Sequence, residues 1–322
     1  MDPAELKKIA ERARFMREAG MALVLASGVL AIFLLLPPFS KDTPGATSPA
    51  VAAPPAGGLA APDAFARIPL HAKAAIVYDL ATGKTLYAKN ADAQLPLASL
   101  TKLLTVYAAF DELAPQATIA IPADVVSLTA PRAFAPGETF ALNDLARLTL
   151  TASLNDGATA IASATAAHKK LAQGEMLAAT AAALNLSQTY AVNGSGLDVN
   201  GSVSGGYGSA RDLARLAGAL VAKAPDVALA TTQSVTTARS AEGASFSVKN
   251  TDPIVDTIPN LLLSKTGYTD LAGGNLALVF DAGIEHPIAI VVLGSSKEAR
   301  FTDGSALMSA TLAHFAGVSS LP

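Results

Sequence analysis

Cysteine is absent from the 322-residue chain. Its absence excludes a disulfide framework, a thiol nucleophile, an iron–sulfur cluster and a cysteine-ligated zinc site. Histidine is scarce, and the few histidines are too widely spaced to form an H-E-x-x-H pair or another close ligand pair. We therefore expect neither a metal nor another cofactor. The histidines are His71, His168, His286 and His314.

Charge is also sparse and nearly balanced. Only 15% of the residues are charged, and 23 lysines and arginines against 26 aspartates and glutamates leave a formal net charge of −3. A nucleic-acid-binding module normally carries a basic excess on one face, so we expect no nucleic-acid partner. Because 51% of the residues are hydrophobic, the composition also excludes a disordered chain and predicts a folded protein.

A run of eighteen residues without a charge, 19–36, lies near the N-terminus. As a helix it would be ~27 Å long, which just spans a bilayer. Basic residues precede the run, whereas the twenty residues after it contain only Lys41, and this bias places the N-terminus in the cytoplasm. The sequence predicts a cytoplasmic segment 1–18, a single-pass anchor 19–39 in the cytoplasmic membrane, and an extracytoplasmic remainder. The preceding basic residues are Lys7, Lys8, Arg12, Arg14 and Arg17.

A cleaved signal peptide is the alternative for this region. The A-x-A-like triplet 50–52 fits a cleavage site, although it lies fourteen residues beyond the apolar run. Residues 40–64 hold five prolines, three glycines and eight alanines, with neither helical nor strand periodicity. This composition predicts a semi-extended tether. The folded domain is then expected at 65–322.

Strand patterns lie at both ends of this domain, with helical patterns between them. Residues 74–80 and 84–90 predict a β-hairpin, and the helical spacing of apolar residues predicts a helix at 99–113. The sequence thus predicts an α+β fold in which both ends of the domain complete one antiparallel sheet, flanked by helices and accompanied by a mainly helical lobe. The other expected elements are helices at 143–150, 157–170 and 304–315 and strands at 234–239, 245–250, 261–269, 273–283 and 286–296.

Ser99 and Lys102 form the only S-x-x-K motif in the chain. Residues three positions apart on a helix share a face, so the hydroxyl and the amine can meet within hydrogen-bond reach. A neutral lysine in this position takes the serine proton as the oxygen attacks a carbonyl. The pair is therefore a candidate nucleophile and base, although an exposed serine beside a solvated lysine has the same spacing.

Two further motifs follow in the chain. Ser153 and Asn155 form the only S-x-N, and the K-T-G at 265–267 ends an apolar strand. One S-x-x-K and one S-x-N are each expected about once by chance, but the three motifs in this order are expected in fewer than roughly one such chain in a hundred. Structural interpretations stay open: Asn155 capping a helix, Thr266 and Gly267 ending a strand, and Tyr268 as a half-buried edge aromatic.

With these motifs the sequence resembles the penicillin-recognising serine enzymes, and within them the D-alanyl-D-alanine carboxypeptidases. The resemblance includes Asn193 with Gly196-Leu197, the segment SARDLARL at 209–216, KNT at 249–251 and KTGYTDLAG at 265–273, and it covers about 74–315. It implies a β-lactamase/DD-peptidase-like fold. It also implies hydrolysis of the terminal D-Ala-D-Ala bond of peptidoglycan stem peptides, with β-lactam antibiotics as acylating inhibitors.

The resemblance implies a role for each motif residue. Ser99 would be the nucleophile that forms an acyl-enzyme, Lys102 its proton acceptor, and Ser153 the relay that passes a proton to the departing D-alanine nitrogen. Lysine must be neutral to accept a proton. We expect burial and the like charge of Lys265 to lower the pKa of Lys102.

Substrate binding falls to the other motif residues. Asn155 would hold the catalytic lysine and the substrate's peptide amide, while Lys265 and Thr266 would receive the terminal carboxylate. Gly267 would keep side-chain bulk away from the strand edge where substrate docks. The backbone N–H groups of Tyr268 and of the nucleophile would form the oxyanion hole.

One departure from the family pattern is Leu154, which replaces the usual glycine of the second motif and is expected to narrow or reshape the cleft. A β-lactamase is one alternative, but Glu175 is the only glutamate between 155 and 239 that could serve its deacylation step. An endopeptidase or transpeptidase would use the same residues, and an idle penicillin sensor or wall-binding module would keep the fold without turnover. Asp212 is expected at the start of a helix rather than as a catalytic acid.

Overall fold

The computed structural model describes residues 63–66, 68–283 and 285–317. The described residues all belong to one compact unit. The predicted anchor 19–39 and most of the predicted tether therefore lie outside the described residues. Within the described part of the chain, no helix has the length and hydropathy of a membrane span.

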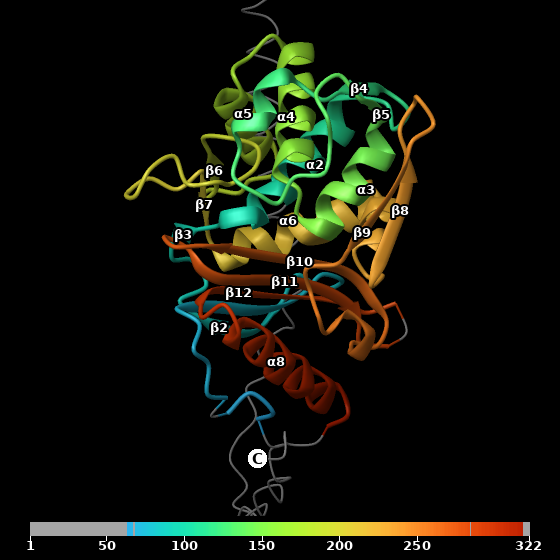
Figure 1. The fold of residues 1–322 in the computed structure, drawn as a ribbon. Helices are drawn as coiled ribbons and strands as arrows, with labels where there is room; N and C mark the ends of the chain where they lie inside the picture. Colours follow the sequence, from blue (N-terminus) through green and yellow to red (C-terminus); the bar gives the residue numbers. More distant parts are fainter. Residues whose placement is uncertain (1–62, 67, 284, 318–322) are drawn as a thin grey trace, which may run out of the picture. The chain divides into compact units, whose positions relative to one another are not determined.

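A five-stranded antiparallel sheet in the order β10-β11-β12-β1-β2 forms the centre of the domain (Figure 1). Ala74 of β1 pairs with Leu293 of β12, which confirms the prediction that both ends of the domain complete one sheet. The expected hairpin at 74–90 is β1 with β2. The strand bounds are β1 Ala74–Asp79, β2 Thr85–Lys89, β10 Leu261–Thr269, β11 Gly273–Asp281 and β12 Pro287–Ser295.

Alternation along the strands divides the core between the two faces of the sheet. Successive side chains of a strand point to opposite faces. On β12, Ile290 and Val292 belong to a core that includes Leu307 of the last helix, α8 (Ala299–Phe315). Their neighbours Val291 and Leu293 belong to the larger core under the helical lobe. Figure 1 shows α8 on one side of the sheet and the lobe on the other.

The lobe is built mainly from the middle of the chain, as predicted. Its first helix differs from the expected 99–113, because a 3₁₀ turn, η1 (Ala98–Leu100), precedes α2 (Thr101–Glu112). The remaining helices are α3 Leu142–Ala152, α4 Asn155–Lys169, α5 Gln173–Ala183, α6 Ala210–Lys223 and α7 Pro225–Ala230, with 3₁₀ turns η2 Ala123–Ser127 and η3 Val255–Thr257. Short strands are β3 Leu95–Pro96, β4 Thr118–Ala120, β5 Thr139–Ala141, β6 Tyr190–Ala191 and β7 Gly206–Gly208.

The strands expected at 234–239 and 245–250 form as β8 (Val235–Arg239) and β9 (Ser245–Lys249). Among the residues that the structure describes, they pair only with each other, as a two-stranded ribbon. Two strands joined by a short turn satisfy each other's backbone groups locally, so their pattern does not reveal whether they also join a larger sheet.

The last helix begins at Ala299 rather than at the expected Gly304. The hydroxyl of Ser296 accepts a hydrogen bond from the backbone N–H of Ala299 at 2.9 Å and so satisfies one free donor of the first turn. Gly304 instead lies inside α8, where an added Cβ would lie 2.7 Å from a methyl carbon of Leu276. This glycine lets the helix approach the sheet closely and does not mark a helix end.

Candidate active site

Ser99 lies in the 3₁₀ turn η1, at the entrance to α2, with its side chain partly buried. The preceding residue, Ala98, is buried and has a φ of 48°, a conformation that non-glycine residues rarely adopt. One turn later, the amine of Lys102 lies 2.7 Å from the hydroxyl oxygen of Ser99. The spacing of the first motif therefore produces the expected hydroxyl–amine pair.

Lys102 is fully buried and donates to two further oxygens. Its Nζ lies 2.8 Å from Oδ1 of Asn155 and 2.8 Å from the backbone carbonyl oxygen of Ser195. Burial lowers the pKa of Lys102 to about 7, while the negative charge of Asp156 acts in the opposite direction. Near neutral pH a substantial fraction of this amine is unprotonated and able to accept a proton.

The second motif lies at the junction between α3 and α4. Ser153 follows α3 with a φ of 59°, in the left-handed region, and is buried. Asn155 is the first residue of α4 and no side-chain cap is formed there. Its Oδ1 accepts from Lys102, and its Nδ2 donates to the carbonyl oxygen of Thr129 at 2.8 Å. The interpretation of Asn155 as a helix cap is therefore wrong, because its amide bridges the lysine and a neighbouring loop.

Strand β10 brings the third motif to the same place. The amine of Lys265 donates to Oγ of Ser153 at 2.9 Å and to the carbonyl oxygen of Thr266 at 2.7 Å. The hydroxyl of Thr266 shares a hydrogen bond of 2.7 Å with that of Thr251, in the KNT segment. Lysine, serine and threonine side chains from three distant segments thus meet at one edge of the sheet.

The amine of Lys265 is buried as completely as that of Lys102. Burial is the largest cause that holds the pKa of Lys265 well below its ordinary value, followed by the positive charges of Lys102 and Arg300, with Asp252 opposing. The expected repulsion between the two lysines therefore acts on Lys265. Repulsion between two like charges is mutual, so each amine disfavours the charged form of the other, while burial is the largest cause of the lowered pKa of both.

Gly267 lies where β10 passes directly beneath the turn that carries Ser99. A Cβ added to Gly267 would lie 3.0 Å from the carbonyl oxygen of Leu97 and 3.3 Å from the backbone nitrogens of Ser99 and Leu100. Tyr268, the next residue, is 44% exposed, and the amine of Lys297 lies 5.4 Å from the centre of its ring. The close approach places the Ser99 N–H beside the Gly267–Tyr268 segment.

Gly267→Ala tests this close approach. We expect kcat/KM to fall by about 10- to 100-fold, because the methyl group must push η1 and β10 apart by a few tenths of an ångström and displace Ser99 from Lys102. Steady-state kinetics of the wild type and variant give this ratio. Gly201→Ala is the matched control, since nothing lies within 4 Å of a Cβ there, and it should retain wild-type kinetics. Equal activity of both variants would mean that the contact at Gly267 does not position the site.

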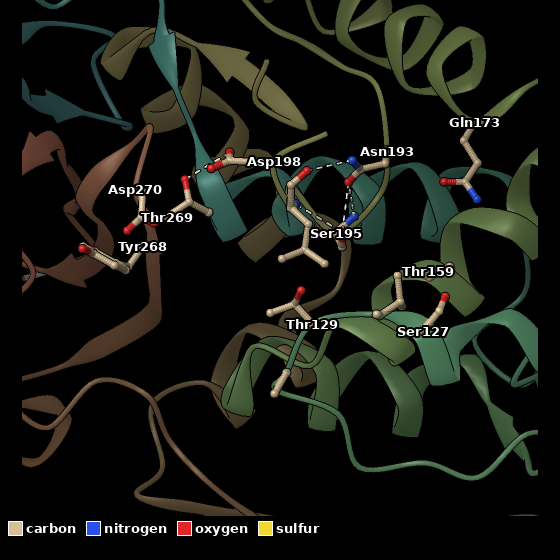
Figure 2. Close-up of a pocket in the computed structure, with 13 residues that line it drawn as sticks. Ser127, Thr129, Thr159, Gln173, Asn193, Ser195, Asp198, Tyr268, Thr269 and Asp270 are labelled. Atoms are coloured by element: carbon tan, nitrogen blue, oxygen red, sulfur yellow. Dashed lines mark hydrogen bonds between the residues drawn. The ribbon is translucent and has the colours of Figure 1, made fainter. Parts of the chain in front are cut away.

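A cavity of about 700 Å³ adjoins these residues (Figure 2). Two residues that line the cavity are fixed by the motif side chains. Asn155 donates to the backbone oxygen of Thr129, and Lys102 donates to that of Ser195. Thr269 on the β10 side donates to Asp198 across 3.1 Å. The cavity is lined by Ser127, Leu128, Thr129, Ala130, Thr159, Gln173, Asn193, Ser195, Leu197, Asp198, Tyr268, Thr269 and Asp270.

Leu154 does not line this cavity. Its side chain is 3% exposed and belongs to the main hydrophobic core. The expectation that this leucine narrows or reshapes the cleft is therefore wrong, because the turn between α3 and α4 directs the side chain into the lobe. Polar side chains stand on either side of it in the motif, at Ser153 and Asn155.

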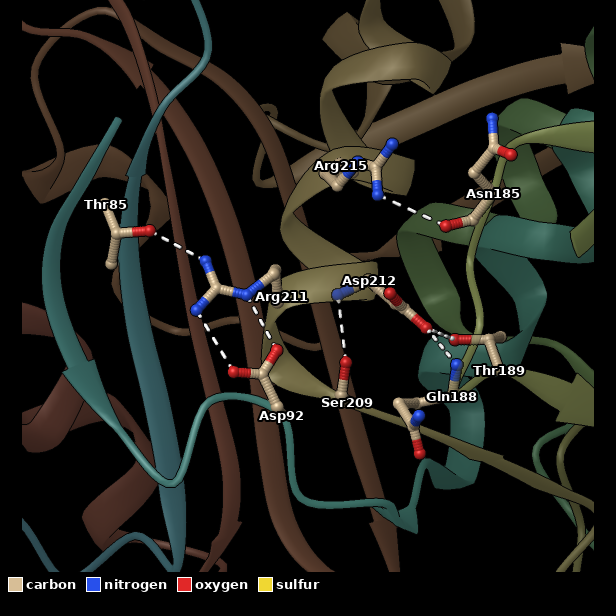
Figure 3. Close-up of polar contacts among 9 residues, drawn as sticks. All are labelled: Thr85, Asp92, Asn185, Gln188, Thr189, Ser209, Arg211, Asp212 and Arg215. Atoms are coloured by element: carbon tan, nitrogen blue, oxygen red, sulfur yellow. Dashed lines mark hydrogen bonds and ion pairs between the residues drawn. The ribbon is translucent and has the colours of Figure 1, made fainter. Parts of the chain in front are cut away.

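Asp212 lies in the first turn of α6, as predicted, and its carboxylate is structural (Figure 3). Its Oδ2 accepts from the backbone N–H of Gln188 at 2.8 Å and from the hydroxyl of Thr189 at 2.9 Å. Ser209 caps the helix by accepting from the N–H of Asp212. The neighbouring Arg211 pairs with Asp92 on another segment.

Several residues of the site carry no motif of their own. Asp156, directly after the second motif, accepts from the backbone N–H groups of Ala133 and Phe134 and so fixes the loop that borders the cavity. Ser195 contributes only its carbonyl oxygen, and its hydroxyl donates to the side chain of Asn193. The sequence indicates that this loop belongs to the site only through the family resemblance, which includes Asn193.

Comparison with known proteins agrees with this arrangement of the three motifs in one site. The sequence profile of the peptidase S11 family, described as D-alanyl-D-alanine carboxypeptidase, matches residues 61–297. The chain belongs to this family. It is therefore a member of the serine-type DD-peptidases, as the three motifs indicated.

Individual relatives extend the likeness over most of the chain. A D-alanyl-D-alanine endopeptidase of Pseudomonas aeruginosa is 30% identical over 272 residues, which cover 81% of this chain and 82% of that protein. Penicillin-binding protein D2 of Listeria monocytogenes, solved with ampicillin bound, is 28% identical with a TM-score of 0.63, covering 75% of this chain and 97% of that one.

A D-alanyl-D-alanine carboxypeptidase of Mycobacterium tuberculosis is 24% identical, with a TM-score of 0.64. The match covers 84% of this chain and 100% of that one. At this identity the likeness concerns the fold. It supports the α+β fold of an antiparallel sheet with helices, which was predicted from the strand and helix patterns.

Proposed function

We propose that this chain is a penicillin-sensitive serine D-alanyl-D-alanine carboxypeptidase of peptidoglycan stem peptides, held at the outer face of the cytoplasmic membrane by residues 19–39. The observation that carries the catalytic part is the buried amine of Lys102, 2.7 Å from the hydroxyl of Ser99 and with a pKa of about 7. A base of this pKa is matched to neutral pH. The anchor is supported by the charge-free run and its basic flank.

In the acylation step, Oγ of Ser99 attacks the carbonyl carbon of the penultimate D-alanine as the neutral amine of Lys102 takes the hydroxyl proton. The negative charge on the carbonyl oxygen is received by the backbone N–H groups of Ser99 and Tyr268. Ser153, which lies beside Lys265, passes a proton to the nitrogen of the departing D-alanine. Attack of water on the resulting ester then frees Ser99.

Substrate recognition rests on the edge of β10. Lys265 and the hydroxyl of Thr266 receive the terminal carboxylate, and Asn155 holds the peptide amide while it keeps Lys102 in place. A carboxylate arriving beside Lys265 favours the ammonium form, which offsets the effect of burial on that amine. A β-lactam presents a strained amide and a carboxylate to the same groups, and the relative solved with ampicillin supports this assignment.

A DD-endopeptidase is the second candidate, because the Pseudomonas aeruginosa relative carries that name at 30% identity. It uses the same nucleophile on a different bond. A β-lactamase has less support, since the carboxylate of Glu175 accepts from the backbone N–H of Ala172 at the start of its own helix α5. That carboxylate is committed to a helix terminus and is not offered as a deacylating base.

Product analysis separates these candidates. Purified protein is incubated with a disaccharide pentapeptide and, separately, with a cross-linked dimer ending in tetrapeptides, and the products are resolved by mass spectrometry. We expect free D-alanine from the pentapeptide and an intact dimer. Cleaved cross-links would establish the endopeptidase instead. Absence of either product, together with rapid turnover of a chromogenic cephalosporin, would favour a β-lactamase.

A further inference from the structure

Arg300 lies in the first turn of α8, behind the strand that carries the K-T-G motif. Its side chain is 7% exposed. The Nη1 atom donates to the carbonyl oxygen of Gly267 at 2.6 Å, whereas Nε is buried and has no hydrogen-bond partner. The main polar contact of this buried cation is thus a single backbone carbonyl, and that carbonyl belongs to the third motif.

The carbonyl of Gly267 and the N–H of Tyr268 belong to the same peptide group. This group is planar and trans, since the cis bond recorded among the described residues is at Ala130-Pro131. In a trans peptide group the C=O and N–H point in opposite directions. A bond that fixes the Gly267 oxygen on the Arg300 side therefore directs the Tyr268 N–H away from Arg300.

The charge of the guanidinium adds a second effect. A charged donor on the oxygen polarises the peptide group and makes its N–H a stronger donor, because linked hydrogen bonds strengthen one another. The bond is also short, as charge-assisted bonds are. The polarised peptide group therefore carries more positive charge on the Tyr268 N–H, at the position where negative charge develops on the substrate oxygen.

Burying the charge of Arg300 costs free energy, and few nearby groups offset this cost. Desolvation lowers its pKa, and its charge also disfavours the ammonium form of Lys265. The groups whose charges act favourably on it are Asp252, Glu298 and Tyr268, and none of the ion pairs among the described residues includes Arg300. The ring of Phe301 lies 4.6 Å from the guanidinium carbon. Buried charges with so few partners are typical of functional sites.

We propose that Arg300 is a positioning residue of the oxyanion hole, which holds and polarises the Gly267–Tyr268 peptide group so that the Tyr268 N–H meets the developing oxyanion. The inference rests on the proposed function, because it presumes an acyl-transfer step at Ser99. It differs from two other roles that a buried arginine here would have: direct binding of the substrate carboxylate, and structural attachment of α8 to the sheet.

The test compares two substrates in three variants. The substrates are an N-acyl-D-alanyl thioester whose leaving group ends in a carboxylate, and the methyl ester of the same compound. The variants are Arg300→Met, Arg300→Lys and, as a matched control, Arg215→Met. Arg215 also donates to a backbone carbonyl, that of Asn185, but it is exposed and its partner belongs to none of the three motifs (Figure 3). The amplitude of fluorescent penicillin labelling at long times gives the folded, active fraction of each protein.

We expect kcat/KM per active site to fall about 10- to 100-fold in Arg300→Met, by the same factor for both substrates, which is less than the ~10² to 10³ for complete loss of a donor. Arg300→Lys should recover part of the loss, since an ammonium can still donate to the carbonyl. Arg215→Met should match the wild type for both substrates.

A loss confined to the carboxylate-bearing substrate would overturn the proposal and make Arg300 a carboxylate ligand. Wild-type rates per active site with a lower melting temperature would also overturn it, leaving a structural role. Failure of the proposed function itself is distinguishable, because the wild type would then not be acylated by penicillin or would be labelled without Ser99.

Discussion

Ser99→Ala is expected to abolish covalent labelling by fluorescent penicillin and to lower kcat on the pentapeptide by on the order of 10⁶. The reason is that the proposed acyl-enzyme ester forms on this hydroxyl, which lies 2.7 Å from the amine that takes its proton. Gel fluorescence after incubation with the labelled penicillin gives the first result, and release of D-alanine gives the second. Lys102 would keep its bonds to Asn155 and Ser195, so the fold should persist.

Ser234→Ala is the matched control for this experiment. Ser234 is exposed and its hydroxyl bonds the carboxylate of Asp256, remote from the three motifs in the chain. It should be labelled as rapidly as the wild type. Persistent labelling of the Ser99→Ala protein would remove this serine from the role of nucleophile and with it the proposed acyl-enzyme.

The pH dependence of acylation tests Lys102. Burial lowers its pKa from the ordinary value to about 7, so the amine is mainly protonated below that pH and mainly neutral above it. Only the neutral amine accepts the Ser99 proton. We therefore expect the acylation rate constant to rise about tenfold per pH unit below neutrality and to level off above about pH 7. Stopped-flow measurements with a fluorescent penicillin give this profile.

Lys102→Met should lower the acylation rate by about 10² to 10⁴ and remove the rise with pH, because a thioether accepts no proton. Lys84→Met, in the exposed turn between β1 and β2, is the matched control and should leave both the rate and the profile unchanged. If the profile of Lys102→Met kept its rise near neutral pH, another group would be the base. Lys265 would then be the first to examine, since its pKa is also lowered by burial.

Most of the fold was predictable from local sequence patterns. The errors lie where contacts between distant residues determine strand pairing or helix boundaries. Apolar runs located β10, β11 and β12, and the helical spacing after Ser99 located α2. The sequence predicts β8 and β9 as two strands but not their separate pairing, because alternation shows that a strand forms but not which strand it joins. It also predicts a helix boundary at Gly304, which is wrong, since the close approach of this glycine to Leu276 exists only in the packed domain.

The site was predictable where side-chain types recur at fixed spacing. The hydroxyl–amine pair of Ser99 and Lys102 follows from one helical turn, and the order of the three motifs indicated a shared cleft. Backbone groups have no such signature, so the carbonyl of Ser195 that fixes Lys102 was not foreseen. Nor was Arg300, because a lone arginine near the end of a chain is usually a solvated surface residue.

The strand order also has a consequence for how the chain folds. β1 lies between β2 and β12, and its first residue, Ala74, pairs with Leu293, near the other end of the domain. On one side, therefore, β1 has no partner until the chain has been synthesised as far as β12. Contacts between such remote segments slow folding and leave apolar strand edges open in the interval. We expect the sheet to form only after β12 has been synthesised and the chain to need protection from aggregation until then.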